Sequence, residues 1–111
     1  MAATSSVNTL ILNSVINLSI DNIDVISLTR ASGEFFRKAY QNVTTISATE
    51  RKYEFYLNET EGSDIITKLS LYGNGATTTL GSGTEMVYQI VNIDKTSNNK
   101  SLLIYWNVRV V

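Results

Sequence analysis

Hydrophobic and polar residues alternate most regularly near the end of the chain. Every second residue from 102 to 110 is apolar, namely Leu102, Ile104, Trp106, Val108 and Val110. The residues between them form the opposite face, namely Leu103, Tyr105, Asn107 and Arg109. A repeat of two residues is typical of a β-strand that buries one face. The pattern therefore predicts a strand over 102–110 with Trp106 in the core.

A similar alternation predicts a half-buried strand over 50–57. One of its faces carries Tyr53, Phe55 and Leu57, and the other carries Lys52, Glu54 and Tyr56. Two further strands are predicted over 65–71 and 86–93. In the first of these, the residues expected to share one face are Ile65, Thr67, Leu69 and Leu71.

The segment 9–28 allows two interpretations. Most even positions from 10 to 20 are apolar, which predicts a strand, and residues 23–28 continue in extended form. Ile11 and Val15 interrupt the alternation and permit a helix instead. Three asparagines within ten residues disfavour that helix, since Asn is a poor helix former.

One short helix is predicted over 29–41. Charged residues mix there with Phe35 and Phe36 at near-helical spacing. Gly33 weakens this interpretation, and Ser32 provides an alternative N-cap.

The connections are marked by turn-forming residues. The acidic segment 58–64 predicts a loop, and 94–100 predicts a hairpin connection. Residues 73–84 hold four of the six glycines and no charge, so they predict a mobile surface loop. A glycine-rich segment can also be a phosphate-binding loop. This one lacks the Gly-Lys-Ser/Thr ending that phosphate-binding loops require.

Together these elements predict a mainly β protein. We expect an antiparallel β-sandwich, or a small barrel, with about six to eight strands and one short helix. A chain of 111 residues has the size of one domain, so we expect a single domain over 1–111, with a flexible N-terminal arm over 1–8.

Composition narrows the function. Nine basic and ten acidic residues give a net charge of −1 without clustering, so nucleic acid is not an expected partner. No apolar run approaches about 18 residues, so a membrane is not an expected partner either. The chain is rich instead in neutral polar residues, with 11 Asn, 12 Ser and 13 Thr. Such a composition favours strands, turns and contact surfaces over electrostatic steering.

The chain contains neither His nor Cys. Their absence excludes Ser-His triads, His general bases, thiolate metal sites and disulfides. Glu59, Glu61 and Asp64 could suggest a calcium loop or a glycosidase pair. These residues lack the alternating Asp/Asn ligands and terminal Glu of a calcium loop. They also lie in one loop, whereas a glycosidase pair faces across a cleft from separate strands. We therefore expect a protein that is not an enzyme and has no metal site and no cofactor.

The stretch from Tyr53 to Val110 resembles small structural proteins of tailed bacteriophages, in particular attachment modules of tail fibres, collars and baseplates. The resemblance lies in an apolar strand ending in Tyr-Gly, a Gly-Ser-Gly-Thr turn and a lysine-led strand containing Trp. The matching residues are Ile66, Leu69, Leu71, Tyr72, Gly73, Gly81 to Thr84, Lys95, Leu102, Ile104, Trp106 and Val108.

This resemblance implies a virion protein, made in the bacterial cytoplasm, that forms a homo-oligomeric ring or trimer and binds other virion proteins. The candidate subunit-contact residues are Leu103, Tyr105, Tyr56, Gly81 and Gly83. The alternative is a carbohydrate-binding β-sandwich, because the outward rings of Tyr56 and Tyr105 could stack on sugars.

Overall fold

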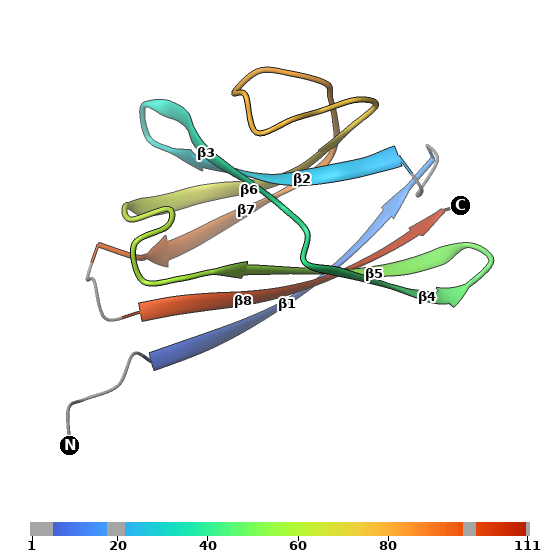
Figure 1. Cartoon of the computed structure of the whole chain (residues 1–111), viewed down its shortest axis with the longest axis horizontal. Coiled ribbons are helices and arrows are strands. Elements are labelled where there is room, and N and C mark those ends of the chain that lie inside the picture. Colours follow the sequence, from blue (N-terminus) through green and yellow to red (C-terminus); the bar gives the residue numbers. More distant parts are fainter. Residues whose placement is uncertain (1–5, 18–21, 97–99, 111) are drawn as a thin grey trace.

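The protein is a β-sandwich of two four-stranded sheets. The computed structural model describes residues 6–17, 22–96 and 100–110 (Figure 1). Sheet A has the strand order β1-β8-β5-β4, and sheet B has the order β3-β2-β6-β7. The strands are β1 (Ser6–Ile16), β2 (Ile23–Arg30), β3 (Gly33–Ala39), β4 (Asn42–Ser47), β5 (Glu50–Leu57), β6 (Ile65–Gly73), β7 (Thr84–Asp94) and β8 (Lys100–Val110).

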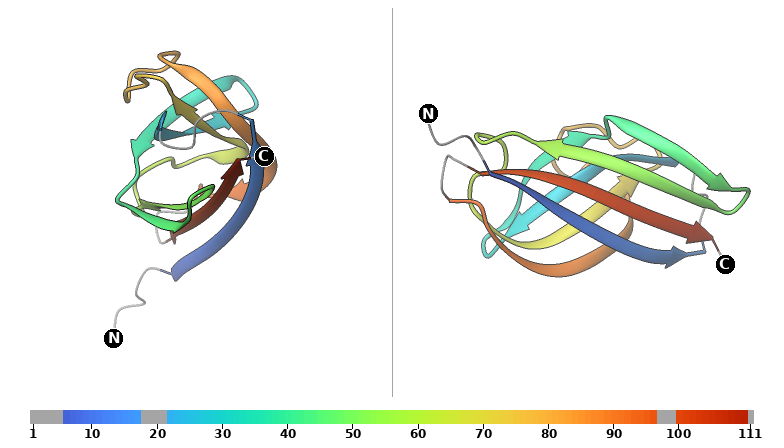
Figure 2. Two further views of the ribbon diagram at one scale, coloured as in Figure 1. Left: turned by 90° about the vertical axis from the view of Figure 1, so that its right-hand side faces the viewer. Right: turned by 90° about the horizontal axis from the view of Figure 1, so that it is seen from below.

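The predicted sandwich is confirmed, with one departure from an antiparallel arrangement. The strands β1 and β8 pair in parallel along their whole lengths, with Leu12 opposite Trp106, whereas the other pairs are antiparallel. Figure 2 (right) looks onto the outer face of sheet A, where β1 and β8 lie side by side. The segment 9–16, for which a helix was the alternative, is therefore a strand.

The core lies between the two sheets and uses the faces that alternation predicts. In β8, Ile104, Trp106 and Val108 have no exposed surface. In β5, Tyr53, Phe55 and Leu57 are buried as well. Burial of a large apolar side chain contributes about 1.5 to 3 kcal/mol, so these two central strands supply much of the stability of sheet A.

The helix predicted over 29–41 is wrong, and the residues form the end of β2 and the strand β3. Leu28 pairs with Phe36 and Thr29 with Glu34, so the ladder skips Phe35. Because this bulge adds one residue to β3, the segment lacks the strict two-residue alternation by which a strand is recognised in a sequence. Gly33 begins β3 with a φ of 127°, a conformation that glycine adopts readily.

Three other details differ from the sequence-based expectations. The register of β6 shifts after Ile66, so Ile66 is buried and Ile65 is exposed. The segment 94–100 links β7 of sheet B to β8 of sheet A, so it is not a hairpin connection. Residues 6–8 of the predicted flexible arm belong to β1, while residues 1–5 lie outside the described part.

Candidate contact surface on the outer face of sheet A

The outer face of sheet A carries a group of apolar side chains that the core does not use. Ile11 lies opposite Tyr105 in the β1–β8 ladder, and Leu103 lies opposite Tyr56 in the β5–β8 ladder. These four residues form what we call the apolar strip. Ile11 is 63% exposed, whereas the other three are half-buried by their neighbours. The strip crosses three adjacent strands, β1, β8 and β5.

Charged groups of both signs border the apolar strip. The Nζ atom of Lys52 lies 5.2 Å from the centre of the Tyr105 ring. Glu54 is the cross-strand partner of Tyr105 and accepts a hydrogen bond from Gln41 Nε2. An apolar centre with a charged rim is the usual anatomy of a protein–protein interface.

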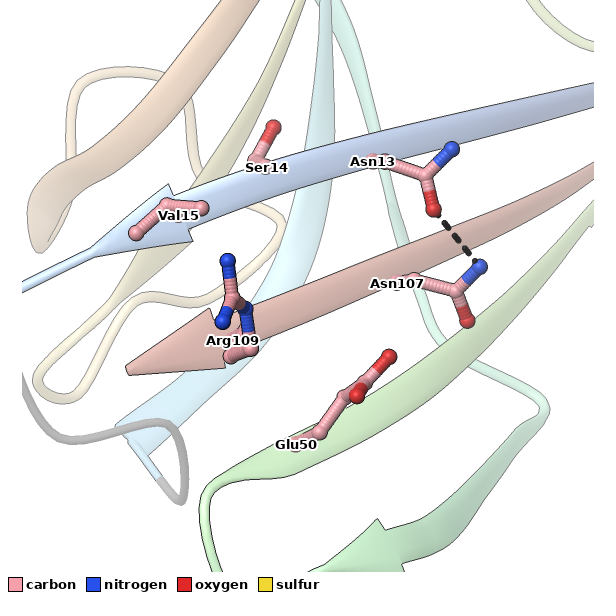
Figure 3. Close-up of a pocket in the computed structure, with 6 residues that line it drawn as sticks. All are labelled: Asn13, Ser14, Val15, Glu50, Asn107 and Arg109. Atoms are coloured by element: carbon pink, nitrogen blue, oxygen red, sulfur yellow. Dashed lines mark hydrogen bonds between the residues drawn. The ribbon is translucent and has the colours of Figure 1, made fainter. Parts of the chain in front are cut away.

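A polar hollow lies on the same face, beyond the strip. Its volume is about 300 Å³, and it is lined by Asn13, Ser14, Val15, Glu50, Asn107 and Arg109 (Figure 3). Asn107 Nδ2 donates to Asn13 Oδ1 at 3.0 Å and links β8 to β1. Val15 is 51% exposed, so the hollow also has an apolar wall.

The glycine-rich loop lies against the other sheet, away from the apolar strip. Asp24 accepts hydrogen bonds from the amides of Gly75 and Ala76, both at 3.1 Å. Arg37 Nη1 donates to the carbonyl oxygens of Thr77 (3.1 Å) and Ser82 (2.9 Å). The glycines and the lack of charge in residues 73–84 predict a mobile loop, whereas these bonds tie the loop to sheet B. The bonding partners are far away in sequence, so the local pattern could not reveal them.

An ion pair between Arg37 and Glu34 organises this loop. The Arg37 side chain is fully buried, with its guanidinium carbon 4.1 Å from the centre of the Tyr72 ring. Arg37 Nε donates to Glu34 Oε2 at 2.6 Å, and Glu34 also accepts from Ser27 and from the Gly81 amide. Burial raises the pKa of Glu34, but these three hydrogen bonds and the positive charge of Arg37 outweigh it and hold the pKa below its ordinary value.

Cationic side chains hold the acidic loop over 58–64. Glu61 pairs with Lys38 at 2.5 Å, and Asp64 pairs with Arg30 at 2.8 Å. The buried Lys95 donates from Nζ to the Asn58 carbonyl oxygen at 2.6 Å, and burial lowers its pKa. Within the described ranges, no three carboxylates come together in a group that could hold a metal ion.

The structure brings together three of the five predicted contact residues. Tyr56, Leu103 and Tyr105 are neighbours in the apolar strip, whereas Gly81 and Gly83 belong to the loop on sheet B. Gly81 bonds to Glu34, and a side chain at Gly83 would collide with Ala76 Cβ. Both glycines therefore have roles inside the domain.

Sequence reasoning missed Ile11 as a member of the strip. In the sequence, Ile11 and Val15 interrupt the alternation of the first strand. In the structure, both side chains lie on the outer face, since Leu12 and Ile16 fill the inward positions. Apolar residues on both faces of a predicted strand were the available signal for an apolar patch on its outer face.

The chain matches no protein-family model, no curated protein and no solved structure. In the part of the chain that the structure describes, no helix is long and apolar enough to cross a membrane.

Proposed function

We propose that the protein is a non-enzymatic structural component of a bacteriophage virion, in the tail, a collar, an adaptor or a fibre anchor. It assembles with copies of itself and binds neighbouring virion proteins after synthesis in the bacterial cytoplasm. The observation that carries the assembly role is the apolar strip, which continues across three strands and has a charged rim. The assignment of the protein to a phage virion rests on the resemblance of residues 53–110 to phage attachment modules.

The residues that carry this resemblance and those of the strip have different tasks. Leu69, Leu71, Ile104 and Trp106 are buried core residues, so the resemblance concerns the framework of β6 and β8. Ile11, Tyr56 and Tyr105 lie on the surface of that framework. A component of this kind would keep the framework and vary the surface according to its neighbours.

A second candidate function, carbohydrate binding, is supported by the polar hollow. Its amide, carboxylate and guanidinium groups suit the hydroxyls of a sugar. Stacking of a sugar on Tyr105 would compete with Lys52, whose ammonium group lies over that ring. For this reason we favour assembly through the strip over sugar binding.

Sedimentation velocity of the purified full chain, from low to tens of micromolar, tests the assembly role. We expect the wild type to form an oligomer and Ile11→Asp to shift it towards monomer. Ile90→Asp is the matched control, because Ile90 is 74% exposed on β7 of the other sheet. A wild type that stays monomeric throughout, or equal effects of both variants, would contradict the proposal.

The sugar alternative is tested with a glycan array and with tyrosine and tryptophan fluorescence during titration with cell-wall fragments. Binding that Asn107→Ala and Arg109→Ala abolish would favour a carbohydrate-binding module. Silence of the folded wild type on the array would remove that candidate.

A further inference from the structure

We infer that the edge strand β4 pairs antiparallel with β4 of a second copy of this chain. This inference rests on the proposed self-assembly and names the segment through which two copies join. The outer edge of β4 is open, because β4 pairs with β5 alone. All six of its residues are exposed.

The sequence of β4 lacks the charged residues and proline that commonly protect an open edge. Natural proteins guard edge strands with charged residues or proline, because unpaired backbone groups would otherwise bind another strand. The strand β4 contains neither, and four of its six residues are β-branched, namely Val43, Thr44, Thr45 and Ile46. Its composition therefore favours strand pairing.

Charged residues guard two of the other three edges of the sandwich. The edge strand β3 carries Glu34, Arg37 and Lys38, and β7 carries Glu85 and Asp94. The strand β1 has no charge, but Gln89 reaches over from β7 and donates to the Asn13 carbonyl oxygen at 2.8 Å. In β4, Arg51 Nη1 donates to the Ser47 carbonyl oxygen at 2.7 Å and the pairing with β5 shifts at Ile46, but both features lie at its last two residues. The stretch 42–45 of this strand carries no charge and pairs regularly with β5.

Exposed apolar side chains around β4 would be covered by a second copy. Val43 is 38% exposed, Ile46 is 51% exposed, and Tyr40 just before the strand is 38% exposed. The turn between β4 and β5 reaches beyond the strands of sheet B at that end of the molecule (Figure 1). A second copy could therefore contact both the unpaired backbone groups of β4 and the apolar side chains around it.

Self-pairing is favoured because the edge is uncharged and fits itself. A two-fold axis perpendicular to the sheet near Thr44 brings the two Thr44 residues opposite each other and Val43 opposite Thr45 of the second copy. Residues that share a face of β4 then remain on one face of the joined sheet. The apolar strips of both copies face the same side and can be covered by one partner.

A charge-exchange experiment in the full chain tests this arrangement. Thr44→Lys and Thr44→Glu each put like charges opposite each other across the axis, whereas a mixture of the two variants puts opposite charges there. We expect each variant alone to weaken the pairing by roughly fivefold and the mixture to restore it. Thr44→Val keeps a β-branched, uncharged residue and serves as the control.

Hydrogen exchange of residues 42–47 is the readout. We expect these backbone amides to become protected as the wild-type concentration rises, and this protection to be lost in each charged variant and regained in the mixture. Exchange that is independent of concentration, or a mixture that regains no protection, would overturn the inference.

The two proposals fail in different ways. Suppose that Ile11→Asp dissociates the oligomer while hydrogen exchange of the β4 amides is independent of concentration. The apolar strip would then remain the assembly surface, and the pairing of β4 would be overturned. If the β4 amides become protected with rising concentration and Ile11→Asp leaves assembly unchanged, the pairing of β4 would be supported. The role of the apolar strip would then be contradicted. A monomer at all concentrations would overturn both.

Discussion

Trp106 donates its indole N–H to the hydroxyl oxygen of Ser14 at 2.9 Å. The same oxygen accepts a hydrogen bond from Gln89 Nε2 at 3.0 Å, so one small side chain links β8, β1 and β7. The indole has no exposed surface, and its polar atom needs this partner because water does not reach it.

Substitution of Ser14 should therefore be costly. Ser14→Ala leaves the indole N–H buried without its acceptor, and we expect a loss of about 1 to 2 kcal/mol in the free energy of unfolding. Urea denaturation of wild type and variant measures this change in the free energy of unfolding. Ser14→Thr retains a hydroxyl and should lose less, so equal losses in both variants would contradict this role of the hydrogen bond.

The two faces of β8 should respond differently to truncation. Trp106→Ala empties a fully buried site and is expected to destabilise the protein by roughly 3 to 5 kcal/mol. Tyr105→Ala, on the outer face, should change the stability of the monomer little. Thermal and urea unfolding at low concentration compare the two, and small, equal effects would mean that the assignment of faces is wrong.

Glu34 should make stability depend on pH in the acid range. Its pKa in the folded protein lies below the ordinary value of 4.5, so its stabilising effect is complete above pH 4.5 and is lost as the pH falls through the folded-state value. We expect Glu34→Gln to cost about 1 to 3 kcal/mol at neutral pH. The difference from wild type in urea unfolding should shrink on acidification, and a constant difference would exclude this linkage.

The two loop glycines should differ in their tolerance of a side chain. Gly81 has a φ of 84°, and a Cβ at this position would have no atom within 4 Å, so Gly81→Ala should cost about 1 kcal/mol from backbone strain alone. At Gly83 the φ is 73°, and a Cβ would also meet the Gly73 carbonyl oxygen at 2.5 Å. We expect Gly83→Ala to cost about 2 to 4 kcal/mol, as measured by thermal unfolding. A larger loss at Gly81 would contradict this packing.

The strands could be predicted where one face is buried and the other is solvated. Tyr53, Phe55 and Trp106 are confirmed core residues because β5 and β8 are central in sheet A and alternate without interruption. Prediction failed at the bulges, since Phe35 and Thr67 each shift the alternation by one residue. A local pattern does not show on which strand a register shift occurs.

The arrangement of the strands in two sheets could not be predicted from local patterns. The parallel pairing of β1 with β8 and the crossing from β7 to β8 depend on contacts between residues far apart in sequence. For the same reason the strip was predicted only in part. Tyr105 and Leu103 follow from the alternation of β8, whereas the position of Ile11 beside Tyr105 depends on the register between strands.

The pairing of β1 with β8 also has a consequence for synthesis on the ribosome. Leu12 can contact Trp106 only after β8 has emerged from the ribosome. The uncharged strand β1 therefore remains unpaired while residues 17–99 are synthesised. Such long-range pairing is slow, and unpaired apolar strands are prone to aggregate. Chaperone dependence during expression should therefore trace to residues 6–16 and not to the glycine-rich loop.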